Sequence, residues 1–240
     1  MNSSPHEPAR KQYVETFDDG PGGWYGFISN QAGSKPLEFR PGVVANHSPW
    51  WIDYNHAPPG AGYLHLLASL NTSGPQTEVL KECGGSNRFI AGKFPTDFRH
   101  ARLTVRLKGE LRRNGAELVL LAQGRVDGLV SGWLLTGQPL AVAEEWTEQT
   151  LALTPDPRLW TPLGSRHDRT DMYGVRPLER VLADVNTNIM FVLFPLDVTP
   201  MGPLKGDPHF LRPERDYPVW RHRLPEGYVE FDEVKVEFQI

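Results

Sequence analysis

The sequence predicts an all-β protein, built as a two-sheet antiparallel β-sandwich with long loops and one or two short helices. Two observations support this prediction. Short apolar runs, many with alternating apolar and polar residues, are separated by turn signals along most of the 240 residues. Glycine and proline, with 23 and 22 residues, together approach a fifth of the chain, which favours turns and short strands over long helices.

The individual strands follow from the period of the apolar residues. In residues 101–108, four apolar residues alternate with Arg, Thr, Arg and Lys, which predicts a strand with one buried and one solvated face. The runs 116–124 and 188–196 are apolar on both faces and predict central strands that are covered on both sides. Further predicted strands cover residues 62–70, 148–156 and 227–240.

The remaining segments complete the expected organisation. Residues 1–12 are polar and predict a flexible N-terminal arm, followed by a single sandwich domain over 13–240. Residues 177–185 begin with proline and place leucines on one side, which predicts a short helix that caps the sandwich. Residues 199–226 are dense in proline, arginine and aromatic residues without periodicity and predict a long loop, a type of segment that is often functional.

Composition and charge exclude several partners. The formal net charge is −4 with both signs interspersed, so no nucleic acid is expected. No apolar run reaches the length of about 18 residues that a membrane span requires. The single Cys83 and the lack of an apolar leader lead us to expect a cytoplasmic protein, although a chain whose signal peptide had been removed would look the same. The sequence does not indicate the oligomeric state.

The two terminal segments carry a resemblance to a known family. Residues 15–27 read ETFDDGPGGWYGF, and residues 227–238 read GYVEFDEVKVEF, where the alternation slips once at Asp232-Glu233 and so predicts a β-bulge. Together they resemble the opening and closing strands of jelly-roll carbohydrate-binding modules, which belong to the concanavalin-like and galactose-binding-like carbohydrate-active proteins. The resemblance implies a jelly-roll sandwich and a carbohydrate ligand.

The same resemblance implies a structural calcium ion. Acidic side chains of these two strands often bind Ca²⁺ in the family, and the matching positions here are Glu15, Asp18 and Asp232. Calcium prefers several hard oxygen ligands, which carboxylates supply. The alternative is that these carboxylates cap turns and pair with lysine or arginine. No organic cofactor is expected.

The stretch PWWIDYNHAPPGAG, residues 49–62, is the strongest candidate for a ligand site. Neighbouring residues of a strand point to opposite faces, so Trp50 and Trp51 cannot fill the same core. We expect one indole to anchor the segment and the other to stack on a sugar, with Asp53, Asn55 and His56 as polar partners. The alternative is that Trp50 packs at a sandwich edge while the polar residues form a turn before the two prolines.

The candidate catalytic residues are Asp53, His56, Glu78 and Glu82. A glycosidase needs two carboxyl groups, whereas a polysaccharide lyase needs a base and a charge stabiliser. Asp53 and His56 lie in the candidate stretch. Glu78 and Glu82 lie beside the only cysteine, and their alternative role is a solvated face with ion pairs.

Arginine and tryptophan in the long loop suggest a second contact region. Arg215 and Trp220 could close over a polyhydroxylated ligand, or the loop could simply cover a sheet edge. Three functions compete: a glycoside hydrolase or lyase with a Trp-lined cleft, a non-catalytic carbohydrate-binding module, and a structural domain. Because the chain is longer than a typical module and rich in polar loop residues, the sequence favours the enzyme.

Overall fold

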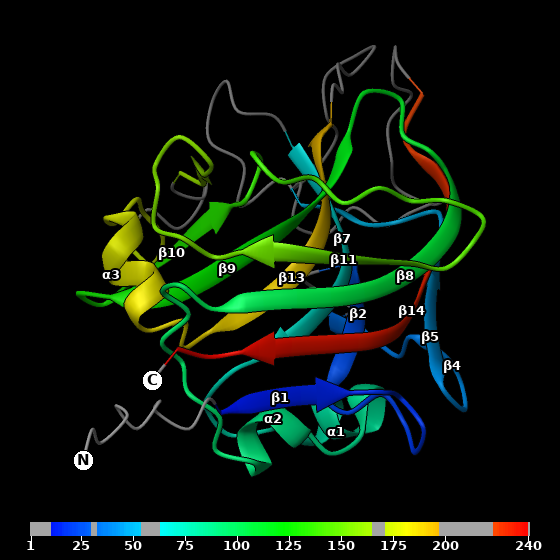
Figure 1. Cartoon of the computed structure of the whole chain (residues 1–240), viewed down its shortest axis with the longest axis horizontal. Coiled ribbons are helices and arrows are strands. Elements are labelled where there is room, and N and C mark those ends of the chain that lie inside the picture. The colour runs from blue at the N-terminus through cyan, green and yellow to red at the C-terminus, as the bar shows by residue number, and fades with distance from the viewer. Residues whose placement is uncertain (1–10, 30–32, 54–62, 165–170, 197–222, 240) are drawn as a thin grey trace, which may run out of the picture.

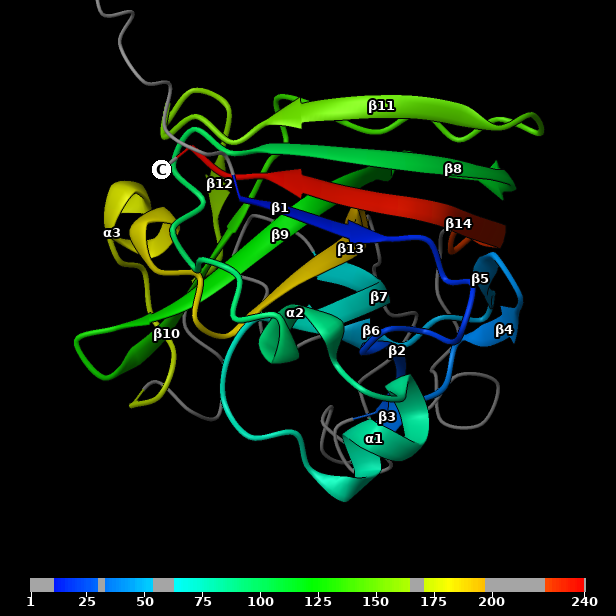
Figure 2. The same ribbon diagram turned by 60° about the horizontal axis from the view of Figure 1, so that its bottom comes forward.

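The computed structural model describes residues 11–29, 33–53, 63–164, 171–196 and 223–239. Within them two antiparallel sheets pack face to face, and Figure 2 shows them as two layers. In spatial order, sheet A contains β11 (Thr147–Ala152), β8 (Arg102–Arg112), β14 (Glu226–Glu237), β5 (Val43–His47) and β4 (Glu38–Arg40). Sheet B contains β12 (Thr161–Pro162), β10 (Leu129–Leu134), β9 (Glu117–Val126), β13 (Asn188–Leu196), β7 (Tyr63–Asn71), β2 (Trp24–Ser29) and β3 (Gly33–Lys35).

Two short strands complete the sheets. In sheet A, β1 (Gln12–Glu15) pairs with the second half of β14, while β5 pairs with its first half, so β1 and β5 follow each other along one side of β14 (Figure 1). In sheet B, β6 (Ile52–Asp53) pairs with the start of β7. The predicted all-β, two-sheet antiparallel sandwich is confirmed.

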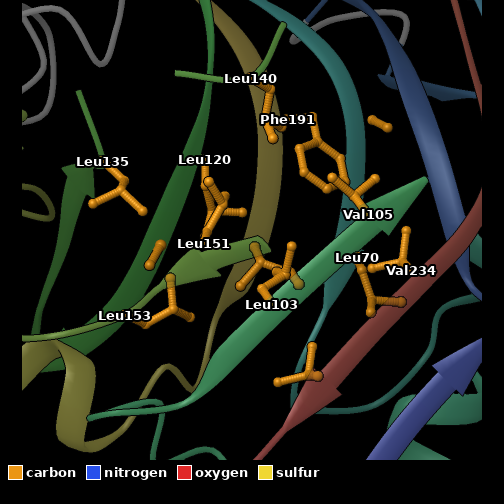
Figure 3. Close-up of a cluster of buried hydrophobic side chains, with 14 of the residues drawn as sticks. Leu70, Leu103, Val105, Leu120, Leu135, Leu140, Leu151, Leu153, Phe191 and Val234 are labelled. Carbon is orange, nitrogen blue, oxygen red and sulfur yellow. The ribbon is translucent and has the colours of Figure 1, made fainter. Parts of the chain in front are cut away.

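The space between the sheets holds the main hydrophobic core. Leu103 and Val105 of β8 point from sheet A towards Leu70 and Phe191 of sheet B (Figure 3). The ring of Phe191 is stacked between Trp24 and Phe231, with ring centroids 5.6 Å and 5.0 Å apart. Each such side chain, once fully buried, contributes about 1.5–3 kcal/mol to folding.

The opposite face of sheet B is also apolar and buried. Its members surround Trp51 and come mainly from β7, β9 and β13. They are Trp51, Leu64, Leu66, Val119, Leu121, Leu134, Leu163, Met190, Val192 and Phe194. The prediction that residues 116–124 and 188–196 form central strands covered on both sides is therefore confirmed.

The predicted β-bulge in the last strand is present. The register of β14 against β8 shifts between Phe231 and Glu233, which leaves Asp232 as the extra residue. Val229 and Phe231 before the bulge and Val234 after it are all buried between the sheets. The extra residue thus allows the apolar side chains on both sides of the bulge to face the core, although their alternation in the sequence changes phase.

Three short helices close the sandwich in the described part of the chain. The predicted helix is α3 (Leu178–Ala183), which packs against β9 and β10 at one end of the sheets (Figure 1). The helices α1 (Glu78–Gly84) and α2 (Arg88–Ala91) were not expected from periodicity, because each is too short to show it. Their N-caps are Thr77 and Asn87, whose side-chain oxygens accept backbone hydrogen bonds. No described helix is long and apolar enough to cross a bilayer.

Candidate functional site

The two adjacent tryptophans lie on opposite sides of sheet B, as strand parity predicts. Trp50 belongs to the core between the sheets, and Trp51 belongs to the apolar cluster on the other face. Their exposed fractions are 2% and 1%, so neither indole offers an open ring face for a sugar to stack on. This corrects the expectation of one ligand-facing indole: both rings contribute to hydrophobic packing.

Pro49 and Trp50, at the start of the stretch 49–62, nevertheless border a pocket. A hollow of about 330 Å³ lies where the chain leaves β5, where β7 begins and where β14 begins. The Trp50 and His65 rings lie 5.8 Å apart at its wall. The described lining residues are Ser48, Pro49, Trp50, His65, Leu224, Pro225 and Glu226.

Among the residues that line this pocket, His65 contributes a buried imidazole. Its exposed fraction is 1%, and Nδ1 lies 3.1 Å from the carbonyl oxygen of Trp51. A carbonyl only accepts hydrogen bonds, so Nδ1 carries the proton and Nε2 is left with its lone pair. Burial lowers the pKa of His65 to about 4, so the ring is neutral near pH 7. Within the described residues Nε2 has no hydrogen-bond partner and is a buried acceptor.

A second hollow of about 280 Å³ adjoins the first. It is lined by Glu110 and Arg112 of β8 and by Glu226, Gly227 and Tyr228 of β14. Glu226 lines both hollows, and its carboxylate lies 3.1 Å from the guanidinium of Arg112. Both partners are more than half exposed, so this ion pair contributes little to stability.

Ser48 and Gly227 join the two hollows. The Ser48 N–H donates to the Gly227 carbonyl at 2.8 Å, and the Gly227 N–H donates to the Ser48 hydroxyl at 3.0 Å. Gly227 has a φ of 131°, and a Cβ at this position would lie 1.9 Å from the carbonyl oxygen of Glu110. Only glycine permits this close approach of β14 to β8.

The predicted acidic residues Glu78 and Glu82 do not border either hollow. Both lie exposed on α1, which packs against β2 and β3. Glu78 forms a hydrogen bond of 2.6 Å with Lys81 one helical turn later. This geometry corresponds to the alternative that the sequence left open, a solvated face with an ion pair.

The other predicted site residues are only partly described. The main chain of Asp53 lies in β6 opposite Leu64, next to the pair formed by Ile52 and His65. The Asp53 side chain lies outside what the structure describes. Asn55, His56, Arg215 and Trp220 also lie outside the described residues, so their roles stay predictions.

The three carboxylates expected to bind calcium have separate partners. Glu15 is fully buried, and its Oε1 accepts hydrogen bonds from Arg88 at 2.8 Å and from the Phe17 N–H at 3.0 Å. Asp18 accepts a hydrogen bond from the Thr16 hydroxyl. Asp232 lies 3.0 Å from Arg106.

This arrangement does not provide a calcium cage. Burial raises the pKa values of Glu15 and Asp232, and arginine already faces each of them. No group of three or more His, Cys, Asp or Glu side chains in the described ranges is placed to hold a metal ion. The described side chains by themselves form no calcium site, and bound calcium stays a prediction of the resemblance.

Sequence reasoning missed the polar groups that line the two hollows. His65 lies in an apolar strand, where the expected role of a histidine is purely structural, and Glu226 ends the predicted loop. Tyr228 is paired with His47 on one side and with Glu110 on the other. Such cross-strand neighbours depend on register, so no local motif reveals them.

The fold defines this chain as a two-sheet antiparallel β-sandwich protein. No protein-family model and no curated protein matches the chain. Among solved structures it is similar to a xylan-binding module CBM15, over 96% of this chain and 97% of that chain, with 9% sequence identity and a TM-score of 0.32. A similarity of this size assigns no ligand and no site residue, so the function is argued from the pocket.

Proposed function

We propose that this chain is a non-catalytic carbohydrate-binding module whose ligand enters the pocket bordered by Trp50, His65 and Glu226. The observation that carries the proposal is the buried Nε2 atom of His65, an acceptor with no partner among the described residues. A buried acceptor without a partner costs roughly 1–3 kcal/mol, a cost that a ligand hydroxyl group would remove by donating to it.

The remaining lining groups suit a polyhydroxylated ligand. The Ser48 hydroxyl accepts from Gly227, so its own proton stays available for a ligand oxygen. The carboxylate of Glu226 accepts hydrogen bonds, and Pro49 and Leu224 provide apolar walls for the C–H groups of a sugar ring. A small number of fixed polar groups among apolar walls is the usual composition of a small-molecule site.

Binding without cleavage is favoured by the positions of the predicted acids. Glu78 and Glu82 face solvent on α1, and Glu226 is paired with Arg112. Cleavage of a glycosidic bond is the second candidate function, since β6 places the main chain of Asp53 one residue from the partner of His65. The two functions can be distinguished experimentally, because only cleavage releases shorter sugars from an oligosaccharide.

The first prediction tests the His65 acceptor directly. Calorimetric titration with neutral glucose, mannose and xylose oligosaccharides is expected to show binding by the wild-type chain. His65→Asn keeps an amide near Nδ1 but removes the acceptor at Nε2, and should lower affinity about ten-fold or more. His65→Gln places an amide oxygen near Nε2 and should retain part of the affinity.

Two controls accompany this experiment. His100→Asn changes an exposed histidine at the opposite end of β8, with a φ of 61° that asparagine tolerates, and should leave affinity unchanged. A reducing-end assay and an absorbance assay for unsaturated products run on the same sugars. No binding by the wild-type chain, or equal affinity of His65→Asn, would overturn the proposal, and product release would favour the enzyme.

A further inference from the structure

We infer that the hollow at Tyr228 is a second sugar subsite, so that the ligand is a neutral oligosaccharide chain that crosses Glu226. The inference rests on the proposed function and extends it from one sugar unit to at least two. Its starting point is the shared wall: Glu226 borders the pocket of Trp50 and His65 on one side and the hollow of Tyr228 on the other.

The sizes of the two hollows agree with one unit in each. Their volumes are about 330 Å³ and 280 Å³, one just above and one just below the lower limit of about 300 Å³ for usual small-ligand pockets. A single hollow of this size suits a small ligand. A chain of linked units would use both hollows and pass the Glu226 carboxylate at the junction.

The second hollow has the groups that a sugar ring requires. Tyr228 is half-buried, and its ring stacks on His47 with centroids 5.2 Å apart and an angle of 29° between the planes. This stacking holds one face of the phenol ring in place. Ligand binding would therefore cost less side-chain conformational entropy. Glu110 lies directly across from Tyr228 on β8, and Arg112 lies across from Glu226. A sugar ring can pack on the aromatic ring of Tyr228, while neighbouring carboxylate and guanidinium groups bind the sugar hydroxyls.

The junction between the hollows is rigid. Ser48 and Gly227 exchange two hydrogen bonds there, and Gly227 allows β14 to approach β8 closely. Both hollows are therefore formed before any ligand arrives. Preorganised subsites at a fixed separation select a chain with matching spacing between its units.

The charges select against acidic sugars. Across both hollows the described lining residues include two carboxylates, Glu110 and Glu226, and one guanidinium, Arg112. The balance is one negative charge, which repels the carboxylate of a uronic acid. The expected ligand class is consequently a neutral oligosaccharide.

The test measures how affinity grows with ligand length. Wild-type chain is titrated with glucose, mannose and xylose series from monosaccharide to tetrasaccharide, and with galacturonate oligosaccharides. We expect the trisaccharide of the preferred series to bind at least ten-fold more tightly than its monosaccharide, and the galacturonates at least ten-fold more weakly than neutral chains of equal length.

Variants then locate the gain. Tyr228→Ala and, independently, the exposed Glu110→Ala should lower the ratio of trisaccharide to monosaccharide affinity at least five-fold. Phe39→Ala removes a ring that is 43% exposed on edge strand β4 of the same sheet and should leave this ratio unchanged. His65→Asn should lower affinity for every length and preserve the ratio.

The outcomes separate the second subsite from the proposed function. Sugar binding that depends on His65 but does not increase with length overturns the second subsite and leaves the binding function in place. The second subsite is also overturned if neither Tyr228→Ala nor Glu110→Ala lowers the ratio, or if galacturonates bind as well as neutral chains. No binding of any sugar overturns both.

Discussion

The buried imidazole of His65 links the pocket to the stability of the protein. Its Nδ1 atom lies within hydrogen-bond distance of the Trp51 carbonyl oxygen, its Nε2 atom is buried, and the residue lines the pocket. Water cannot solvate a proton added to this ring, so burial lowers its pKa to about 4 from the ordinary value of 6.5. Acid therefore protonates the unfolded chain before the folded one.

This pKa predicts a loss of stability in mild acid. Between pH 6.5 and pH 4 the unfolded state binds more protons at His65, so the free energy of unfolding falls as the pH falls. The full contribution is roughly 3 kcal/mol for a shift of this size. Urea denaturation at pH 7, 5.5 and 4.5 should show that wild type loses more stability than His65→Gln over this range. Parallel pH profiles of the two proteins would contradict the prediction.

Glu15 is a second buried ionisable side chain and, unlike His65, it is paired with a side chain of opposite charge. The carboxylate is fully buried, Arg88 bonds to one oxygen, and Gly22 leaves room for the other, because a Cβ there would lie 1.7 Å from Oε2. Removing one partner of a buried pair leaves an uncompensated charge, and the cost greatly exceeds that of breaking a surface pair.

The Arg88→Met substitution tests this pair. Because the Arg88 side chain is 37% exposed, we expect a loss of about 2–3 kcal/mol, below the 3–5 kcal/mol that is typical when a fully buried pair is broken. Chemical denaturation at pH 7 measures the difference. The matched control is Arg158→Met, whose side chain is 88% exposed and pairs with Asp156 on the surface. Equal losses for the two variants would show that the burial of Glu15 is irrelevant.

Among the strands, β14 contributes most to the candidate site. Its first residue, Glu226, borders both hollows, Gly227 and Tyr228 border the second, and its second half carries the bulge at Asp232 and the pairing with β1. The strand lies between β8 on one side and β5 with β1 on the other. The described lining of the second hollow consequently comes from strands alone, whereas the first hollow also uses the segments that follow β5 and precede β14.

The geometry of β14 predicts an unequal effect of two glycine substitutions. Gly227→Ala places a methyl group 1.9 Å from the Glu110 carbonyl in a backbone with φ of 131°, so both strain and a clash oppose it. Gly115→Ala meets no atom within 4 Å and carries only the strain of its φ of 94°. We expect Gly115→Ala to cost about 1 kcal/mol and Gly227→Ala at least about 3 kcal/mol in denaturation experiments. Gly227→Ala should also weaken sugar binding, and equal stability losses would refute the close approach.

For the whole molecule, both faces of sheet B are buried, whereas sheet A has one apolar and one charged face. On the outer face of sheet A, Lys108 and Arg106 lie 5.0 Å and 5.4 Å from the Trp146 ring centroid, and Glu230 bonds to Arg40 at 2.7 Å. These cross-strand contacts satisfy the charges of that face. The candidate site lies where this polar face reaches the end of the sandwich at the start of β14.

Local pattern alone determined a large part of this architecture. The alternation over residues 101–108, the apolar runs of β9 and β13, and the slip at Asp232 are properties of neighbours in the chain. Strand geometry has a period of two, so these patterns specify which side chains face the core without reference to distant residues. Strand parity likewise determined that Trp50 and Trp51 lie on opposite sides of their sheet.

Only the tertiary structure decided how deeply each side chain is buried and what it meets. Both indoles are covered, because sheet B is packed on both faces, and this could not be deduced from their own segment. The pocket joins Ser48, His65 and Glu226 from three strand ends, and the hydrogen bond between Gly227 and Ser48 spans 179 residues of sequence. Sheet register brings such groups together through long-range pairing, whereas a local sequence pattern reports only on residues a few positions apart.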